Sequence, residues 1–375
     1  MNFDFTEEQT LLKDMVERFV AERCTPELRR AVQKSPEGWS RALWKEMAEL
    51  GLLGVNVPEE AGGLGGGAVE TKLVMEAIGR GLATEPYLAS AVVATALLRH
   101  APESAQRGAL LGALAGGETV LAPALYERNG RYDFDHVETT AVKRGADYVL
   151  NGGKCAVIGG GAADGFIISA RTRAGGGGGS VALFHVPRGA RGLNVIAARA
   201  LDGTSIASLL LDDVSAPGEN VVAADHALPI IEHAVDHGIS ALAAEAVGAM
   251  RASIDITADY LRTRQQFGRP IGQFQVLSHA CVDMFVHCED ASSASILAAG
   301  RVDSADATQR RRALSAAKVT VNKACRFVGQ TAIQLHGGIG MTEEYVIGHY
   351  FRKLIAIENL FGDTDHHLGL FAAMK

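Results

Sequence analysis

Apolar side chains recur at helical spacing through the first third of the chain. Thr6 and Gln9 have the pattern of a capping box, and apolar residues follow every three or four positions over Leu12–Val20. A second run at this spacing, Gly38–Leu50, ends in a glycine-rich segment in which a helix cannot continue. The helical pattern then resumes, which predicts an N-terminal helical domain over residues 1–118.

The period of the apolar pattern shortens to two in the middle of the chain. From about Thr119 to Asn220, short apolar stretches alternate with clusters of Gly, Asn and Pro, which is typical of strands joined by turns. This pattern predicts a middle β domain over residues 119–222. The consecutive glycines Gly175–Gly179 lie between two strands with no helix after them, so we expect a hairpin loop and not a phosphate-binding loop. The clearest predicted strands are Tyr148–Gly152, Gly165–Arg173, Ser180–Pro187 and Ser208–Val214.

Helical spacing returns after Pro217 and continues to the end of the chain. The long runs predict a C-terminal four-helix bundle over residues 223–375. The order of helices, strands and helices indicates an α+β multi-domain protein, because a parallel sheet would need strands that alternate with helices. The predicted helices are His226–Thr263, Phe274–Gly300, Ala305–Leu335 and Glu343 to about Leu360.

Composition and charge exclude several classes of function. Of the 375 residues, 47% are hydrophobic and 21% are charged, as in ordinary globular proteins. The net charge of -7 argues against a nucleic-acid partner, which would need a basic surface. The longest apolar stretch, Ala89–Leu98, is far shorter than the roughly 20 residues that span a bilayer, so we expect a buried helix and no membrane partner. The acidic N-terminus lacks the pattern of a secretion signal, which predicts a cytoplasmic protein.

The five cysteines are expected to be free thiols. The closest two, Cys281 and Cys288, lie about two helical turns, roughly 10 Å, apart on one predicted helix, which is too far for a disulfide. Two adjacent histidines, His366 and His367, have no third candidate ligand at a useful spacing. We therefore expect no metal site, and a role for these histidines at a helix start or an interface.

Four segments, in this order along nearly the whole chain, resemble the acyl-CoA dehydrogenase family. They are LGVNVPEEAGGLG (Leu53–Gly65), NGGKCAVIGGG (Asn151–Gly161), RQQFGRPIGQFQ (Arg264–Gln275) and QLHGGIGMTEEY (Gln334–Tyr345). The resemblance implies that family's fold, with a β-barrel-like domain between an N-terminal helical domain and a C-terminal four-helix bundle. The ending FGDTDHH (Phe361–His367) is similar to the small subunits of heteromeric members, of the pimeloyl-CoA dehydrogenase small-subunit type.

The resemblance implies an FAD cofactor that is shared between two subunits. Arg264 matches the arginine that reaches the pyrophosphate of the flavin on the neighbouring chain, a role that suits a forked cation. Alone, Arg264 is also compatible with a solvated arginine at a helix end. Glycines matching the adenine-contacting segment allow close backbone approach, and are equally compatible with a helix-ending turn. The further matching residues are Phe267, Gln275, Gln334, Gly337 and Gly338.

Two segments depart from the family pattern. The family has a Glu-Pro-x-Ala-Gly-Ser-Asp segment that contributes to flavin and thioester binding, where this chain has Leu121–Asp135, which reads LAPALYERNGRYDFD. The family covers the flavin ring with Trp-Ile-Thr/Ser, where this chain has Ala156, Val157 and Ile158. An apolar triplet can pack a β domain but cannot form hydrogen bonds to a flavin ring.

The family's catalytic base is also missing. The resemblance implies a carboxylate that removes the α proton of the thioester while a hydride passes to flavin N5. The family places this carboxylate at one of two positions in the chain. The residues of this chain at those two positions are Phe361 and Gly238. Asp236 is the nearest substitute, although it lies about 200° around a helix from Gly238 unless the helix begins later. Glu245 and Asp363 are further candidates, but each is more typical of an ion pair, a helix cap or a solvated carboxylate.

Three functional hypotheses remain. In the first, the chain is a catalytically degenerate partner that completes the FAD site of a larger homologous dehydrogenase subunit through Arg264, Gln275 and Gln334. In the second, it is a self-sufficient homo-oligomer, a dimer or tetramer, with a displaced base such as Asp236 and an electron-transfer flavoprotein as electron acceptor. In the third, it binds an acyl-CoA thioester on the same fold without redox chemistry. The first is preferred because it explains the lost base and the lost flavin cover together.

Overall fold

The structure, a computed structural model, describes residues 4–35, 37–173 and 179–374. The chain divides into two compact units. The first unit combines Met1–Ala31, Ala68–Ala83 and Ile239–Lys375, and the second combines Val32–Gly67 and Thr84–Gly238. Each unit is therefore assembled from segments that are distant in the sequence.

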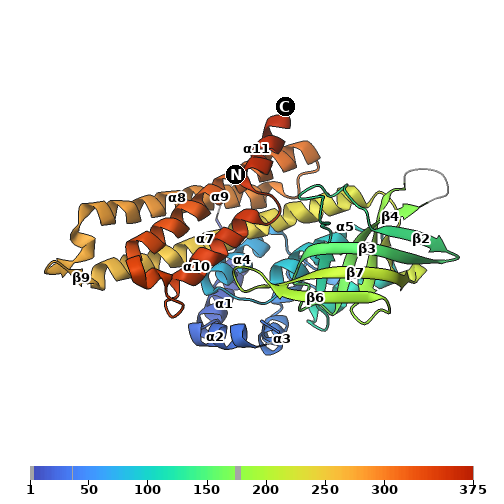
Figure 1. Cartoon of the computed structure of the whole chain (residues 1–375), viewed down its shortest axis with the longest axis horizontal. Coiled ribbons are helices and arrows are strands. Elements are labelled where there is room, and N and C mark those ends of the chain that lie inside the picture. The colour runs from blue at the N-terminus through green and yellow to red at the C-terminus, as the bar shows by residue number, and fades with distance from the viewer. Residues whose placement is uncertain (1–3, 36, 174–178, 375) are drawn as a thin grey trace. The chain divides into compact units, whose positions relative to one another are not determined.

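The first unit is helical. Its long C-terminal helices run alongside one another as a bundle, with α9 packed against α8, α10 and α11 (Figure 1). A short hairpin joins α7 to α8, and the first turns of α7 belong to the second unit. The elements are α1 (Glu7–Arg23), α2 (Pro26–Lys34), α4 (Ala68–Gly81), α7 (Ala227–Thr263), β9 (Gln265–Gln266), β10 (Arg269–Pro270), η5 (Ile271–Gln273), α8 (Gln275–Arg301), α9 (Ala307–His336), η6 (Gly337–Met341), α10 (Ile347–Asn359) and α11 (Thr364–Ala373).

The second unit contains a mostly antiparallel sheet. Its strand order is β6-β7-β3-β2-β4-β5-β8, with β1 beside β4, and the pairs β1–β4 and β2–β4 are parallel. The strands are β1 (Leu121–Ala124), β2 (Thr140–Arg144), β3 (Asp147–Ile158), β4 (Gly165–Arg173), β5 (Val181–Pro187), β6 (Leu193–Arg199), β7 (Ser205–Ala216) and β8 (Val221–Ala223). The helices are α3 (Arg41–Glu49), η1 (Leu52–Gly54), η2 (Glu59–Ala61), the π-helix η3 (Leu88–Ala94), α5 (Thr95–His100), α6 (Ala105–Ala115) and η4 (Gly218–Asn220).

Two glycines set the separation of α4 and α7 in the first unit. A methyl group at Gly79 would lie 1.9 Å from the carbonyl oxygen of Glu245, and one at Gly248 would lie 1.8 Å from that of Glu76. No side chain tolerates such contacts, so the two backbones approach closely only because both positions lack one. This approach also brings the Glu76 side chain to Arg251, with which it forms an ion pair.

The predicted order of helices, strands and helices is confirmed. Thr6 and Gln9 form the expected capping box, with bonds of 3.2 Å from the Gln9 N–H and 3.1 Å from the Thr6 N–H. Ala89–Leu98 is helical and buried throughout. The loop expected at Gly175–Gly179 lies, for residues 175–178, outside the described residues. Within the described ranges, no helix is long and apolar enough to cross a membrane.

Two helices escape the sequence prediction, α2 and α11. In α11 the only buried side chain is that of His367, so no apolar stripe marks the helix in the sequence. Its start is fixed instead by the Asp363 carboxylate, which accepts a hydrogen bond of 2.8 Å from the N–H of His366. The predicted four-helix bundle is therefore followed by a further short helix, and α10 begins at Ile347, four residues later than the predicted Glu343.

Candidate cofactor site and catalytic positions

A tight hairpin follows α7. Between its paired strands, Phe267 and Gly268 have left-handed φ angles of 52° and 79°. Two successive left-handed residues form the turn that best fits a two-residue hairpin loop. The Phe267 side chain is 91% exposed, and its ring meets the edge of Phe274 with a centroid distance of 6.1 Å. An aromatic ring held in solvent by a fixed turn is suited to contact with another molecule.

Arg264 is the first residue after α7, and its backbone is fixed on both sides. Its N–H donates to the carbonyl of Tyr260 at 2.9 Å, and its carbonyl accepts from the N–H of Ile271 at 2.9 Å. The side chain is exposed, and within the described part of the chain its guanidinium makes no hydrogen bond or ion pair. An uncommitted guanidinium on a fixed backbone offers the forked donors that bind phosphate oxygens.

The C-terminal end of α9 lies at the same end of the bundle as Arg264. The ring of His336, the last residue of α9, stacks on Tyr260 of α7 with a centroid distance of 4.5 Å and an interplanar angle of 25°. This contact fastens the end of α9 to the last turn of α7. Gln334, also in the final turn of α9, is exposed beside it.

The backbone beyond α9 is open to solvent. Gly337 has a φ of 63°, and a methyl group at Gly337 or Gly338 would meet no atom within 4 Å. Gln275 begins α8 just after the hairpin and is exposed. One end of the bundle thus carries a cation, two amide side chains and an uncovered backbone, a donor set that suits the phosphates and adenine of a dinucleotide.

The end of β3 is very different. Ala156 has a left-handed φ of 48°, at a point where the pairing of β3 with β7 is irregular between Lys154 and Val157. Val157 is 1% exposed and Ala156 is exposed. The bulge therefore presents a methyl group to solvent and turns the larger side chain into the core. Neither group can donate a hydrogen bond to a ligand.

A buried ion pair underlies this strand end. Lys154 donates to the Glu127 carboxylate at 2.6 Å and to the Ser169 hydroxyl at 2.9 Å. Glu127 also accepts from the backbone N–H groups of Glu138 and Thr139 at 2.6 and 3.1 Å. Burial lowers the pKa of Lys154 to about 8, while the Lys154 charge and these hydrogen bonds overcome burial and hold the pKa of Glu127 below its ordinary value. Both groups are committed to the sheet.

Phe361, at the first of the two base positions, is enclosed. It is 4% exposed and has a left-handed φ of 59°. Its carbonyl lies 3.1 Å from Nε2 of His367, whose Nδ1 lies 3.2 Å from the hydroxyl of Ser315. Burial and the charge of Lys318 lower the pKa of His367 to about 4, so this imidazole is neutral near pH 7. The position holds an apolar ring against a neutral network.

A buried lysine lies close to that network. Lys318 is fully buried, and its three donors reach the Asn322 side-chain carbonyl at 2.8 Å and the backbone carbonyls of Ile357 and Glu358 at 2.8 and 3.4 Å. Burial lowers the pKa of Lys318 to about 7. The carboxylate of Glu358 pairs with Arg326, at 3.2 Å for the Nε donor. The Glu358 carboxylate, whose charge acts on Lys318, is therefore already bound by a cation.

The second base position lies inside a helix. α7 runs without interruption from Ala227, so Gly238 stands in its fourth turn and Asp236 points about 200° away from it. Asp236 is 4% exposed. A later helix start, which would have allowed Asp236 to share the face of Gly238, does not occur.

Glu245, the next carboxylate on α7, forms a buried ion pair. Its carboxylate accepts from Nζ of Lys353 on α10 at 2.7 Å, and the two side chains are 6% and 5% exposed. This carboxylate is committed to the ion pair, because without it the buried Lys353 ammonium would lose its partner. Asp363, the last candidate, caps α11.

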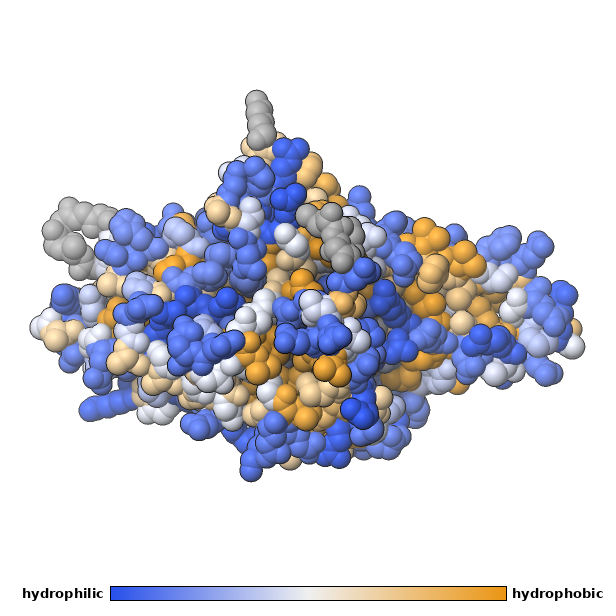
Figure 2. All heavy atoms as spheres, turned by 180° about the vertical axis from the view of Figure 1, so that it is seen from behind, coloured by the Kyte–Doolittle hydropathy of each residue, from blue (hydrophilic) through white to orange (hydrophobic). Residues whose placement is uncertain are grey.

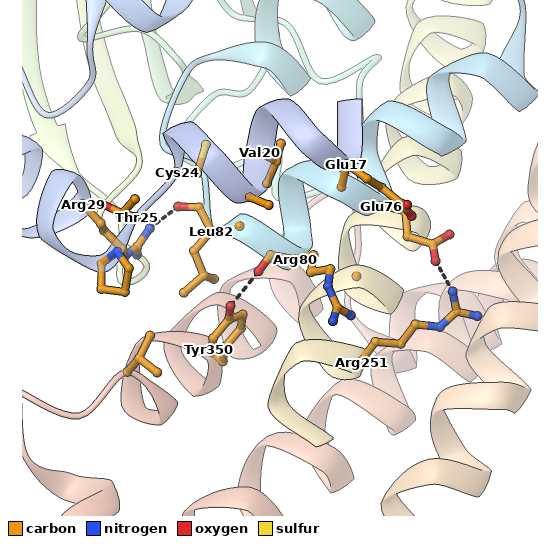
Figure 3. Close-up of a pocket in the computed structure, with 16 residues that line it drawn as sticks. Glu17, Val20, Cys24, Thr25, Arg29, Glu76, Arg80, Leu82, Arg251 and Tyr350 are labelled. Atoms are coloured by element: carbon orange, nitrogen blue, oxygen red, sulfur yellow. Dashed lines mark hydrogen bonds and ion pairs between the residues drawn. The ribbon is translucent and has the colours of Figure 1, made fainter. Parts of the chain in front are cut away.

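The first unit also contains a cavity of about 500 Å³ between α1, α4, α7 and α10 (Figure 3). Its two lining carboxylates, Glu17 and Glu76, are in ion pairs. Tyr350 donates to the carbonyl of Arg80 at 2.6 Å, and burial raises the pKa of Tyr350 to about 12. Both lining carboxylates are thus bound by cations, which makes this cavity a poor site for proton abstraction.

Comparison with known proteins identifies the family. Models of the N-terminal, middle and C-terminal domains of acyl-CoA dehydrogenases match residues 6–118, 122–214 and 228–374. The chain belongs to the acyl-CoA dehydrogenase family. Its N-terminal helices, middle sheet and C-terminal bundle are the parts of that fold.

Similar proteins match nearly the full length. The chain is 30% identical to the acyl-CoA dehydrogenase FadE27 of Mycobacterium tuberculosis, over 98% of this chain and 97% of that protein. It is 29% identical to the probable acyl-CoA dehydrogenase YngJ of Bacillus subtilis, over 96% of this chain and 95% of that protein. A chain of the ChsE4–ChsE5 complex from Mycobacterium tuberculosis has a TM-score of 0.87 at 26% identity, over 98% of this chain and 97% of that chain.

Acyl-CoA dehydrogenases are FAD-dependent, and this chain fits one part of such a site better than another. The bundle end with Arg264, Gln334 and the open glycines suits the phosphate and adenine parts of FAD. The end of β3 lacks the indole and hydroxyl that would cover and bind the flavin ring. The part of the chain that does not suit FAD is therefore the end of β3 in its own sheet, where the flavin ring would be bound.

Sequence reasoning missed two buried lysines, Lys353, which binds the candidate base Glu245, and Lys318, which binds backbone carbonyls just before Phe361. Lys353 lies on the buried stripe of α10 with Tyr350, Leu354 and Ile357, and Lys318 lies on that of α9. A lysine on an apolar stripe needs a buried partner, so the spacing alone carried a signal.

Proposed function

We propose that this chain is the catalytically degenerate subunit of a heteromeric acyl-CoA dehydrogenase. It pairs with a larger homologous subunit that carries the active site for α,β-dehydrogenation of an acyl-CoA thioester. Arg264, Gln275 and Gln334 bind the FAD that the larger subunit holds. The bound FAD supplies the hydride acceptor of the reaction.

One observation carries this proposal. Neither base position provides a carboxylate, because Phe361 is a buried phenyl ring and Gly238 has no side chain. The alternative carboxylates Glu245 and Asp363 are bound to Lys353 and to the start of α11. At the described positions where the family places its base, proton abstraction from a thioester therefore has no carboxylate.

The contribution of this chain to a shared site is binding and orientation. Arg264 donates to phosphate oxygens, and its backbone bonds to Tyr260 and Ile271 limit the entropy lost when the side chain is ordered. Gly337 and Gly338 leave room for the adenosine part of the cofactor. Gln275 and Gln334 supply amide donors and acceptors beside them.

Exposed apolar side chains on α8 support a partner subunit. In the space-filling view, apolar surface gathers over the helical bundle at the right of the picture (Figure 2). A patch of this kind, mixed with polar residues, is typical of a subunit interface. It adjoins the hairpin that carries Phe267, and the ChsE4–ChsE5 relative is itself described as a complex of two proteins. The α8 residues are Val276, Val282, Phe285, Val286, Ile296 and Leu297, which are 41–73% exposed.

The decisive test is anaerobic reduction of bound flavin by a panel of acyl-CoA thioesters. The chain alone and the chain co-purified with its larger homologue are mixed with each thioester, and flavin absorbance is followed. We expect the isolated chain to bleach about 10² to 10⁴ times more slowly than the complex, because general-base catalysis is absent. Rapid bleaching by the isolated chain would refute the proposal in favour of a self-sufficient enzyme.

The variant Asp236→Asn tests whether Asp236 is the base, whether or not the isolated chain proves active. In the complex we expect this variant to bleach at the wild-type rate, because Asp236 faces away from Gly238. If the isolated chain is active and Asp236→Asn abolishes that activity, the second hypothesis, a homo-oligomer with a displaced base, replaces the first.

A further inference from the structure

Three histidines gather in the second unit, and one of them is next to Gly238 in the sequence. His100 is the last residue of α5, and His233 and His237 lie one turn apart on α7. One ligand nitrogen of each histidine lies within 4.8 Å of the others. The rings of His100 and His233 stack at 3.9 Å, and that of His237 lies 5.7 Å from His100 and 5.1 Å from His233.

This spacing is close to that of a three-histidine metal centre. Zinc binds imidazole nitrogen at about 2.0–2.1 Å, which places the nitrogens of a tetrahedral site roughly 3.3 Å apart. Side-chain rotations that move each nitrogen by about 1 Å would bring the three onto one ion. The i, i+4 pair on α7 is the spacing by which one helix face presents two ligands.

We propose that His100, His233 and His237 bind a divalent transition-metal ion, with zinc as the expected occupant. Neutral imidazole is a preferred ligand of zinc, copper and nickel, whereas calcium and magnesium select oxygen. Three protein ligands leave the fourth position of a tetrahedral ion for water or an anion. The ligands come from two helices separated by more than 130 residues, so their spacing in the sequence does not suggest a metal site.

The surroundings favour a cation. His100 stands at the C-terminal end of α5, where the helix dipole is negative. Glu232 and Asp236 precede the two α7 ligands by one residue each and place carboxylates along the neighbouring stripe of that helix. His237 is 7% exposed and the other two are half-buried, so a bound ion would be shielded from solvent on one side and reachable on the other.

A metal here would fasten α5 to the first turns of α7. His237 directly precedes Gly238, so the ion would fix the helix at one of the two positions where the family places its base. This role is independent of the proposed function, because it requires neither FAD nor a partner subunit.

Cobalt substitution tests the site in the purified wild-type chain. The protein is treated with a chelator, dialysed and titrated with Co²⁺ while its visible absorption is recorded, and Zn²⁺ affinity is then measured by competition. We expect one Co²⁺ ion per chain. Its visible ligand-field bands should be those of a four-coordinate ion, and no charge-transfer band from a thiolate ligand should appear. Absence of Co²⁺ and Zn²⁺ binding by the chelated protein would overturn the proposal, as would a thiolate band, since it would assign the ion to a cysteine.

Ligand variants sharpen the result. His233→Gln and His100→Gln should each weaken Zn²⁺ binding by at least roughly 10- to 100-fold. Loss of a residue that only hydrogen-bonds to a metal ligand already costs that much, and these variants remove a ligand itself. His279→Gln, at an exposed histidine on α8, is the matched control and should bind as the wild type does. Equal affinity in all three variants would overturn the assignment. If a ligand variant fails to fold, a Zn²⁺-dependent rise in the wild-type unfolding temperature that is absent with Mg²⁺ supports the site, and its absence counts against it.

Discussion

Two regions of the first unit, both expected from the family to serve FAD chemistry, differ in their exposure. At the end of the bundle, Arg264 is solvated and uncommitted, and the backbone at Gly337 is uncovered. Around Phe361 the side chains are buried and bonded to one another, with His367 on the Phe361 carbonyl and Lys318 on the neighbouring carbonyls. One region is open to a ligand from outside, and the other is closed as part of the core.

The difference indicates that cofactor binding and proton abstraction are separable on this fold. A surface cation can be kept for another subunit's ligand at little cost in stability, because it stays hydrated when the ligand is absent. A carboxylate base in a closed corner must be desolvated and balanced, so once the chemistry moves elsewhere an apolar ring is the more stable occupant. The degenerate-subunit proposal depends on this contrast.

The largest effect is expected from Glu245→Gln, which breaks a buried ion pair that, like the Phe361 region, is closed to solvent. Removing one partner of a buried ion pair leaves the Lys353 charge uncompensated and should cost about 3–5 kcal/mol of unfolding free energy. Urea unfolding followed by circular dichroism measures this loss. Glu289→Gln, at an exposed carboxylate on α8, is the control and should change stability by less than about 0.5 kcal/mol. If Glu245→Gln instead lost flavin reduction without losing stability, Glu245 would be a catalytic base. The difference between an open cofactor-binding region and a closed, inactive one would then no longer hold.

A smaller effect is expected at the open region, from Arg264→Ala. Loss of charge-assisted hydrogen bonds to phosphate, worth about 1.5–3 kcal/mol, should lower flavin affinity roughly 10- to 100-fold in the assembled protein. The unfolding free energy should stay within about 0.5 kcal/mol of the wild type. The flavin-to-protein absorbance ratio measures occupancy. Arg262→Ala, an exposed arginine paired with Asp259 at 3.6 Å, is the control, and an equal loss in that variant would remove the specific role of Arg264.

The smallest effect concerns pH and the buried Lys318. Its pKa is about 7 in the folded chain against an ordinary 10.5, so the unfolded chain binds more protons between these values and stability rises with pH through that window. From pH 7 to pH 9 this group should add about 2 kcal/mol, and below pH 7 its contribution is constant. Urea unfolding of the wild type and of Lys318→Met at pH 7 and pH 9 measures the contribution of Lys318 to the change in unfolding free energy. A wild-type slope that Lys318→Met leaves unchanged would mean that Lys318 is not the titrating group.

The sequence predicted much of the fold and less of the site. Changes in the spacing of apolar residues located the strand region and the long helices, because each of these elements buries apolar side chains at a regular interval. They did not reveal α11, whose start depends on a single cap at Asp363. The domain limits and the roles of Arg264, Phe267, Gln275, Gln334, Gly337, Gly338 and Asp236 remain predictions, whereas family membership and its FAD dependence are established by comparison.

By itself the sequence determined which chemical groups are present. Phe361, Gly238 and Ala156 exclude a carboxylate or a hydroxyl at their positions whatever the fold, because chemistry at a position is limited by its side chain. Only the tertiary structure decided which groups are committed to each other. Glu245 and Lys353 are 108 residues apart in the chain, and the three histidines come from two separate helices. Such pairs depend on helix packing, and a local pattern can mark a buried lysine without identifying its partner.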